Sequence, residues 1–259
     1  MREVLPVIIA SYQRLGLLKQ TIESIRENSY HDVKIIVVDN STDKKVIRYL
    51  ESLSDITLFR WGNRKKYPHL RVWTPDGFFY PPEQQPSPYW TEKWSLGKTR
   101  TMGAILAPPS NYLYFCDNDM YHTKDWDKWM VKALKDYPGM VMVGGSGQYT
   151  TGADASPVGK DHTVSSVSLQ VGNTMMVRRQ EWSRIGYFPD YDEDTWISRE
   201  ISDRYKKTPG EIKPWVVIHC GIKSFFTGGA INFSDEKTLT YDTVNIGLNK
   251  IKYPELLYE

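Results

Sequence analysis

The stretch Tyr112-Leu113-Tyr114-Phe115-Cys116-Asp117-Asn118-Asp119 decides which fold the sequence predicts. Its run of apolar and aromatic residues is typical of a short strand that is buried on both faces of a parallel sheet. The run ends in two carboxylates at positions i and i+2, which point to the same side where the chain is extended. Ligands of open α/β sheets bind outside the carboxyl ends of the strands, so Asp117 and Asp119 stand where a ligand is expected.

Two unpaired carboxylates this close together repel each other, and the repulsion raises the pKa of one of them. A divalent cation relieves the repulsion, and oxygen ligands suit Mg²⁺ or Mn²⁺. The alternative is a polar turn after a strand, because the pattern Asp-x-Asp is common. The stretch by itself therefore predicts either a metal site or a turn.

Composition limits the class of protein. The chain has 259 residues, a net charge of +2 and 40% hydrophobic residues, which favours a folded protein without a general attraction to nucleic acid or anionic membranes. Only Cys116 and Cys220 are present, so a disulfide framework is excluded and a reducing compartment is indicated. Pro6 interrupts the first apolar run, and no run approaches the ~20 residues that span a bilayer. We expect a soluble, cytoplasmic protein with no integral membrane segment, while a peripheral membrane contact stays open.

Apolar strands alternate with amphipathic helices through the first part of the chain. Strands are predicted at 4–10, 33–38 and 56–61, with helices at 14–28 and from an Asp43 or Thr42 cap to Leu50. This rhythm predicts a parallel sheet with crossover helices. The less regular remainder is predicted to contain helices at 95–107, 126–137, 181–185 and 195–206, and strands at 140–143, 164–171, 174–177 and 215–219.

Residues 62–94 break this rhythm with six prolines, several cations and many aromatic residues. A loop of this length is either functional or a packed surface excursion. No linker separates independent units, so we expect one domain over 1–259. It would comprise a first half at about 1–120, a second half at about 121–225, and a tail at 226–259.

The order of several motifs resembles the GT-A glycosyltransferases of the large family 2, over roughly residues 4 to 225. The matching segments are Val7-Ile8-Ile9-Ala10-Ser11-Tyr12-Gln13-Arg14, Ile35 to Asp43, Gly97-x-x-Arg100-x-x-Gly103, Asp117-Asn118-Asp119, Gly172-Asn173 to Arg179, and Asp192-Glu193-Asp194-x-x-x-x-Arg199. The family usually has Asn after the arginine of the third motif, where this chain has Thr101.

The resemblance implies an α/β, Rossmann-like GT-A fold, with a mostly parallel central sheet flanked by helices and a small mixed acceptor-side subregion. It implies transfer of a hexose-type sugar from a nucleotide-diphosphate sugar, with Mn²⁺ or Mg²⁺ offsetting the charge of the leaving diphosphate. The implied metal ligands are Asp117, Asp119 and the strand-end residue His219, which from the sequence alone is better explained as a structural histidine.

The donor would be held by residues at the ends of the first strands and on the helix before the metal motif. Asp39 can accept a hydrogen bond from a nucleobase imide, which favours a UDP-sugar; the alternative is a turn former, and one residue can have both roles. Lys98 and Arg100 can add charge at the diphosphate, or be solvated cations on a helix face. The full predicted donor set is Ala10, Ser11, Tyr12, Arg14, Asp39, Lys98, Arg100 and Asn118.

An acceptor hydroxyl needs a base to take its proton as it attacks. We predict Asp194 for this role, with Glu193 second, although an acidic run is also typical of a helix start. Direct attack on the anomeric carbon predicts inversion. A glycan acceptor is favoured, with Trp196, Asn173, Trp73 and Trp90 as its contacts. The alternatives are hydroxymethylated bases in DNA, suggested by the cations and aromatics of 62–94, and a non-catalytic nucleotide-sugar-binding protein.

Overall fold

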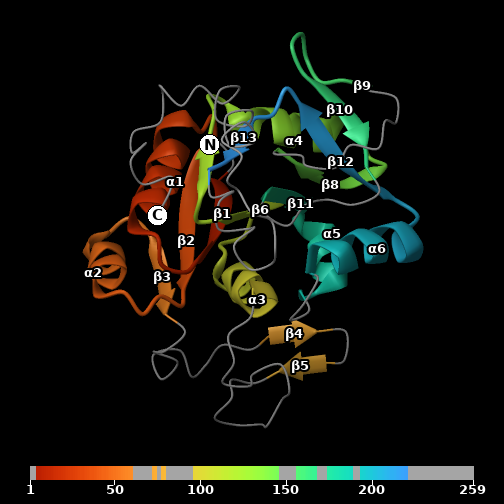
Figure 1. The fold of residues 1–259 in the computed structure, drawn as a ribbon. Coiled ribbons are helices and arrows are strands. Elements are labelled where there is room, and N and C mark those ends of the chain that lie inside the picture. The colour runs from red at the N-terminus through yellow and green to blue at the C-terminus, as the bar shows by residue number, and fades with distance from the viewer. Residues whose placement is uncertain are drawn as a thin grey trace, which may run out of the picture.

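One large sheet runs through the centre of the computed structural model, with helices on both of its faces (Figure 1). The described residues are 4–60, 72–74, 77–79, 96–145, 156–167, 174–188 and 193–220, with side chains left out at 72–74, 77–79 and 193–195. Within them the sheet has nine strands in the order β3-β2-β1-β6-β11-β8-β12-β10-β9. This architecture confirms the predicted α/β class.

The parallel half of the sheet consists of β3 (Thr57–Arg60), β2 (Asp32–Asp39), β1 (Val4–Ser11) and β6 (Tyr112–Asp117). Each neighbouring pair among these strands is parallel. The chain crosses between them through α1 (Leu15–Asn28) and α2 (Lys44–Ser52), as the alternation of strands and helices predicts. Asp43 caps α2 by accepting a hydrogen bond of 2.8 Å from the backbone N–H of Lys45.

The mixed half consists of β11 (Thr174–Arg178), β8 (Met140–Gly144), β12 (Thr208–Lys213), β10 (Thr163–Ser166) and β9 (Ser156–Pro157). Strand β11 is antiparallel to both β6 and β8, β12 is parallel to β8, and β10 is antiparallel to β12 and β9. This mixed part is larger than the small subregion predicted. The difference comes mainly from β12, whose Pro209-Gly210 breaks the strand pattern in the sequence.

The remaining elements lie on or beside this sheet. They are the helices α3 (Leu96–Leu106), α4 (Trp126–Asp136), α5 (Arg179–Ile185) and α6 (Glu193–Tyr205), the ribbon of β7 (Met120–His122) with β13 (Val217–His219), and the ribbon of β4 (Val72–Thr74) with β5 (Gly77–Phe79). No helix in the described part of the chain is both long and apolar enough to cross a membrane.

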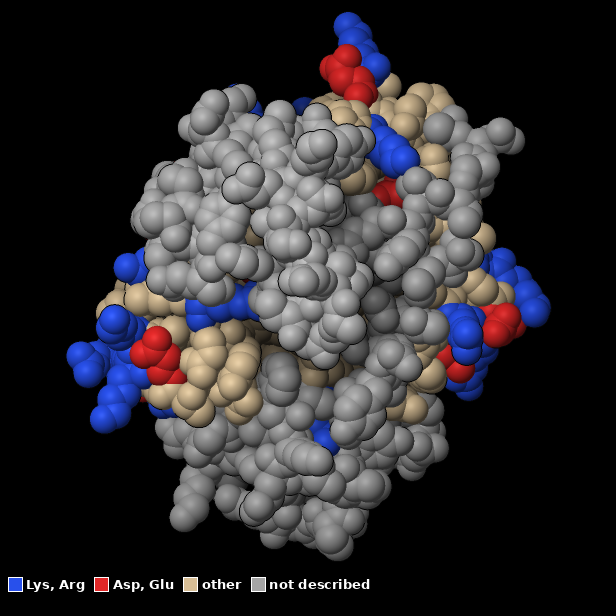
Figure 2. Space-filling model, in the orientation of Figure 1, with Lys and Arg blue, Asp and Glu red and all other residues tan. Residues whose placement is uncertain are grey.

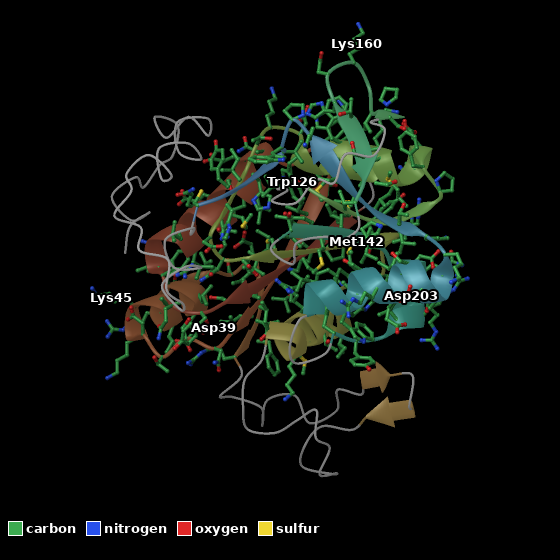
Figure 3. The ribbon with its side chains drawn as sticks, turned by 45° about the vertical axis from the view of Figure 1, so that its right-hand side comes forward. Asp39, Lys45, Trp126, Met142, Lys160 and Asp203 are labelled. Carbon is green, nitrogen blue, oxygen red and sulfur yellow. The ribbon has the colours of Figure 1, made fainter. Side chains whose placement is uncertain are left out.

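Alternating residues of the strands divide the core into two layers. Tyr114 and Cys116 of β6 pack into one layer with α1, α2 and α4, while Leu113 and Phe115 pack into the other with α3, α5 and α6. Figure 3 shows Trp126 and Met142 inside the molecule, whereas Lys45 and Lys160 extend from its surface. A strand buried on both faces is what the continuous apolar run in β6 predicts.

Helix α3 lies unusually close to the parallel half. A Cβ atom added at Gly103 would come within 2.2 Å of the Ile8 side chain, so only glycine permits this approach. The close packing explains the second glycine of the Gly97-x-x-Arg100-x-x-Gly103 motif. It also holds Arg100 against the end of β6.

Candidate functional site

Polar residues meet at the carboxyl edge of the parallel half. The strand register places Ser11 beside Asp39 and Ala10 beside Asp117, so the ends of β1, β2 and β6 are neighbours. Ser11 and Asp39 are buried, and Asp117 is partly exposed. Three predicted site residues therefore share one edge of the sheet, at the position where open α/β sheets bind ligands.

The turn between β1 and α1 has an uncommon backbone conformation. Gln13 and Arg14 both have φ of 56°, in the left-handed region that costs a non-glycine residue about 1–3 kcal/mol. Gln13 offsets this cost through its own hydrogen bonds. Its N–H donates to Ser41 Oγ at 2.8 Å, its Nε2 donates to Thr42 Oγ1 at 2.7 Å, and its Oε1 accepts from the Asp43 N–H at 3.0 Å. The turns after β1 and β2 are thereby joined.

Asp39 stabilises the turn after β2. Its Oδ1 accepts hydrogen bonds from the Ser41 N–H at 3.2 Å and from Ser41 Oγ at 2.6 Å. Its Oδ2 lies 3.6 Å from Arg60 Nε and makes no hydrogen bond within the described part of the chain. Asp39 is thus a turn former through one oxygen, and the other oxygen is without a hydrogen-bond partner. Tyr12, beside this edge, is 47% exposed.

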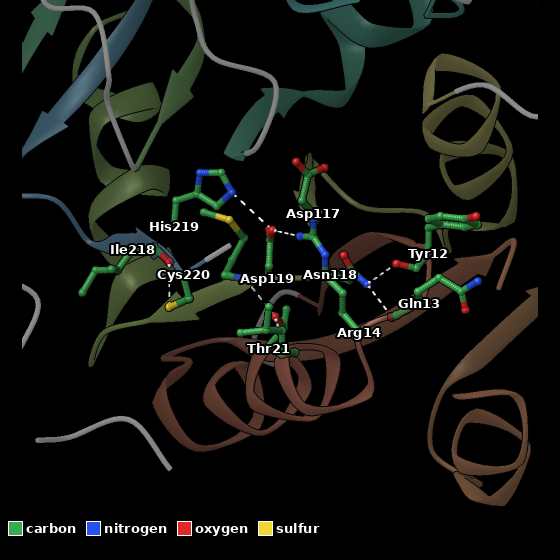
Figure 4. Close-up of polar contacts among 12 residues, drawn as sticks. Tyr12, Gln13, Arg14, Thr21, Asp117, Asn118, Asp119, Ile218, His219 and Cys220 are labelled. Atoms are coloured by element: carbon green, nitrogen blue, oxygen red, sulfur yellow. Dashed lines mark hydrogen bonds and ion pairs between the residues drawn. The ribbon is translucent and has the colours of Figure 1, made fainter. Parts of the chain in front are cut away.

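Asp119 is the centre of a buried charged cluster (Figure 4). Its Oδ2 accepts from Arg14 Nη1 at 2.5 Å and lies 3.3 Å from His219 Nε2. Its Oδ1 is buried and has no hydrogen-bond partner among the described residues. Strand β13 brings His219 to this place by pairing it with Met120, and the Cys220 N–H donates to the Asp119 carbonyl at 2.8 Å.

The charges in this cluster stabilise one another. Burial alone would raise the pKa of Asp119, but the charges and hydrogen bonds of His219 and Arg14 hold it below its ordinary value. Burial alone would lower the pKa of His219, but Asp119 raises it. The described structure therefore favours the ionised form of Asp119, with the Arg14 guanidinium and the His219 ring against the same carboxylate oxygen.

Asp117 has a different partner. Its Oδ1 accepts from Arg100 Nη2 at 2.9 Å, and the Arg100 side chain is completely buried. Residues 118 and 119 form a turn between β6 and β7, so the extended backbone assumed for this stretch ends at Asp117, while the shared role of Asp117 and Asp119 stays a prediction. Asn118 instead donates from Nδ2 to the carbonyls of Tyr12 and Gln13, at 3.3 and 3.1 Å, and supports the β1–α1 turn.

The residues fit a divalent cation in part. Asp119 and His219 supply an oxygen and a nitrogen of the kinds that Mn²⁺ and Mg²⁺ sites use, and the orphaned Oδ1 of Asp119 is a buried acceptor in need of a donor or cation. Among the residues that the structure describes, however, no group of three His, Cys, Asp or Glu side chains is arranged to hold a metal ion. The three-ligand set of Asp117, Asp119 and His219 stays a prediction.

Some of the other predicted residues have side chains that the structure describes, and the rest do not. Lys98 and Arg100 are buried on α3, which excludes the alternative of solvated helix-face cations. Trp196 is partly buried against Tyr187, with ring centroids 5.2 Å apart. Glu193 is the first residue of α6, so the acidic run does lie at a helix start. The remaining calls lie outside the described residues or side chains, namely Asn173 and Trp90 altogether, and the side chains of Trp73, Glu193 and Asp194.

The sequence reasoning assigned no role to Gln13 or His122. Gln13 gives no signal in the sequence, because its role depends on a left-handed backbone. His122 is a buried histidine whose Nδ1 lies 3.3 Å from Ser24 Oγ and whose Nε2 lies 3.0 Å from the Tyr114 hydroxyl. Burial lowers the pKa of His122 to about 3, so it stays neutral and joins β7 to α1 and β6.

Comparisons with known proteins agree with this geometry. Residues 7–69 match the family model described as Glycosyl transferase family 2, a segment that contains both turns joined by Gln13. A mannosyltransferase of Pyrobaculum calidifontis, solved with GDP-Man and Mn²⁺, superposes with a TM-score of 0.52 at 15% identity, over 81% of this chain and 54% of that one. The fold is GT-A.

Two further GT-A structures are similar to this chain. GalNAc-T7, solved with UDP, GalNAc and Mn²⁺, gives a TM-score of 0.59 at 14% identity, over 84% of this chain and 43% of that one. S. aureus TarS 1–349 gives a TM-score of 0.54 at 12% identity, over 96% of this chain and 72% of that one. The chain thus spans about half the length of the first two structures. A comparison with curated protein sequences gave no match.

Proposed function

We propose that this chain is a metal-dependent, inverting glycosyltransferase that moves a hexose-type sugar from a nucleotide-diphosphate sugar to an acceptor hydroxyl. One observation carries the proposal. Asp119 and His219 meet in a buried cluster at the carboxyl edge of the parallel half, in a GT-A fold whose relatives were solved with nucleotides and Mn²⁺. The family match over residues 7–69 supports the same activity.

The donor diphosphate would lie against this edge. When bound, a divalent cation would offset the negative charge of the departing diphosphate. Asp119 and His219 would hold that cation, with Asp117 as a supporting ligand or ribose contact. Lys98 and Arg100 are buried cations on α3, and Arg100 already holds Asp117 in place. These side chains add fixed positive charge where the leaving group develops negative charge.

The nucleobase would lie over the two joined turns. Ala10, Ser11, Tyr12 and Arg14 surround the end of β1, and Asp39 has one oxygen without a hydrogen-bond partner in the described structure. A carboxylate oxygen of this kind can accept the ring N–H of uracil, so a UDP-sugar is our first choice of donor. GDP and UDP both occur in the solved relatives, and the experiment below compares them.

The start of α6 would supply the general base. Asp194, or Glu193 in second place, would take the proton of the acceptor hydroxyl as its oxygen bonds to the anomeric carbon. The bond from that carbon to the diphosphate oxygen breaks in the same step, and the electron pair leaves with the nucleoside diphosphate. Attack on the face opposite the leaving group inverts the configuration.

A saccharide or glycan is the acceptor that we favour, with Trp196, Trp73 and Trp90 as stacking surfaces and Asn173 as a polar contact. Hydroxymethylated bases in DNA are the second candidate, because residues 62–94 interleave cations with aromatics. On the face in Figure 2, the described Lys and Arg side chains are scattered, some beside Asp or Glu and some not, and do not gather into one basic patch that would support a DNA acceptor. Both cysteines are free thiols, which suits a reducing compartment such as the cytoplasm.

The test is a transfer assay with a panel of UDP-, GDP- and dTDP-sugars and Mn²⁺, offered to glycans and to hydroxymethylated DNA. We expect metal-dependent transfer from a UDP-sugar to a glycan, with little dependence on ionic strength. Transfer to DNA whose affinity falls steeply with salt would select the second acceptor. No turnover with any donor, together with tight nucleotide-sugar binding, would select a non-catalytic binding protein.

A further inference from the structure

The Arg14 guanidinium forms an ion pair with Asp119, the carboxylate that would bind the proposed metal. We propose that Arg14 and a divalent cation compete for Asp119, and that the donor diphosphate draws the guanidinium away so that the cation can bind. Nucleotide and metal would then bind with positive coupling, and the protein would bind the metal poorly in the absence of nucleotide. This inference rests on the proposed function, because it assigns Asp119 to the metal.

The competition follows from two contacts on one oxygen of the Asp119 carboxylate. Arg14 Nη1 lies 2.5 Å from Asp119 Oδ2, and His219 Nε2 lies 3.3 Å from the same oxygen. A metal on Oδ2 would sit at about 2.0–2.2 Å, and there the guanidinium would be close enough for strong repulsion between two cations. A metal on the unpartnered Oδ1 would still lie within a few ångströms of the guanidinium charge.

The turn holds the backbone of Arg14 but leaves its side chain able to move. Gln13 and Asn118 fix the turn through hydrogen bonds to Ser41 and to the carbonyls of Tyr12 and Gln13. The Arg14 side chain is 27% exposed, whereas the Asp119 side chain is 5% exposed. A guanidinium can therefore exchange a carboxylate for a phosphate without any change in the fold of the turn.

The donor supplies the group that makes this exchange favourable. A diphosphate offers several oxygens that bind a guanidinium in its preferred forked geometry. Once Arg14 turns to a phosphate, Asp119 Oδ2 and His219 Nε2 become available to a cation, which the diphosphate also attracts. Arg14 thereby acts as a positioning residue that keeps the buried Asp119 charge paired until the donor arrives.

The experiment measures free Mn²⁺ by its electron paramagnetic resonance signal during titration of the full chain, with and without UDP or GDP. Wild type is compared with Arg14→Gln. The matched control is Arg26→Gln, because Arg26 also pairs with an aspartate, Asp55 at 2.6 Å, but at the surface. We expect Arg14→Gln to bind Mn²⁺ about tenfold more tightly than wild type in the absence of nucleotide. We also expect Arg14→Gln to show a smaller gain on addition of nucleotide, and Arg26→Gln to behave as wild type.

Asp119→Asn separates the two ways in which the account can fail. If Asp119→Asn weakens Mn²⁺ binding but Arg14→Gln binds Mn²⁺ no more tightly than wild type, the competition is refuted while the metal site stands. If Asp119→Asn leaves Mn²⁺ binding unchanged with nucleotide present, the metal is not at Asp119. Both the site proposal and the role of Arg14 are then overturned.

Discussion

The parallel and mixed halves of the sheet contribute to the site in different ways. In the parallel half, β1, β2 and β6 each end in a polar residue, and the register makes Ser11, Asp39 and Asp117 neighbours. Among its described residues, the mixed half presents no such row. Beyond its strand β12, the chain returns through β13 and places His219 against Asp119. A parallel sheet thus forms a binding edge from its strand order alone, whereas the buried charge cluster needs a partner from the far end of the described chain.

The largest expected effect comes from removing the charge on which this cluster depends. We expect Asp119→Asn to reduce sugar transfer by about 10³-fold or more, because the cation and Arg14 both lose their anionic partner. The comparison is made by transfer assay against Asp55→Asn, an exposed aspartate in the ion pair with Arg26. Wild-type rates in Asp119→Asn would show that the charge cluster has no part in the chemistry.

A second test asks whether helix α6, which leads into β12, carries the general base. We expect Asp194→Asn to lower the rate of transfer by about 10²–10⁴-fold, because the acceptor hydroxyl loses its proton acceptor. Donor affinity should stay at the wild-type value, because the donor edge belongs to the parallel half. Glu193→Gln is the matched neighbour and should cost less. Equal rates in Asp194→Asn and wild type would remove Asp194 from the mechanism.

His122 joins the β7–β13 ribbon to the parallel half. Its titration should therefore change how the free energy of unfolding depends on pH. Burial lowers the pKa of His122 from 6.5 to about 3, so between these values the unfolded chain binds a proton that the folded chain does not. The free energy of unfolding should therefore fall as pH drops from about 6.5 toward 3. In urea unfolding, His122→Gln should be less stable than wild type at pH 7 but should lose less stability on acidification. Parallel pH profiles for the two proteins would contradict a buried neutral histidine.

The smallest expected effect lies in the mixed half. Glu211 of β12 is 2% exposed, and within the described part of the chain its buried carboxylate accepts no hydrogen bond of normal geometry, although Lys213 and Trp215 act to lower its pKa. Burial raises the pKa of Glu211, so its ionisation destabilises the fold as pH rises through that pKa. We expect Glu211→Met to raise the free energy of unfolding at pH 7 by about 1–3 kcal/mol, and by less at pH 4. Glu200→Met, at a more exposed glutamate paired with Arg204, is the control and should not stabilise. Destabilisation by Glu211→Met would indicate an interaction of this carboxylate that the account lacks.

The sequence predicted the parallel half closely because its signals are local. Continuous apolar runs marked β1, β2 and β6, and the periodicity of Leu18, Ile22 and Ile25 marked α1. Turn residues after each strand placed Asp39 and Asp117 at the edge. These features depend on neighbours within a few residues, so pattern and propensity suffice to find them.

The rest depends on geometry that no local pattern encodes. Strand β12 was not predicted because it contains Pro209 and Gly210, which are unfavourable residues in a strand. They are tolerated here beside a register shift. The turn at residues 118 and 119 directly follows the strand, where the spacing of Asp117 and Asp119 suggested extended backbone. The contact between Asp119 and His219 was implied by family resemblance and not by spacing, since the two residues are 100 positions apart in the sequence.

The central claim is that the donor diphosphate and a cation bind together at Asp119 and His219. Its most direct test is calorimetric titration of UDP and GDP into wild type, Asp119→Asn and His219→Gln, each in Mn²⁺ and in excess EDTA. The account predicts that Mn²⁺ tightens nucleotide binding to wild type and that this gain is lost in both variants. Nucleotide affinity that is the same in Mn²⁺ and EDTA for wild type, or a full Mn²⁺ gain in Asp119→Asn, would contradict it.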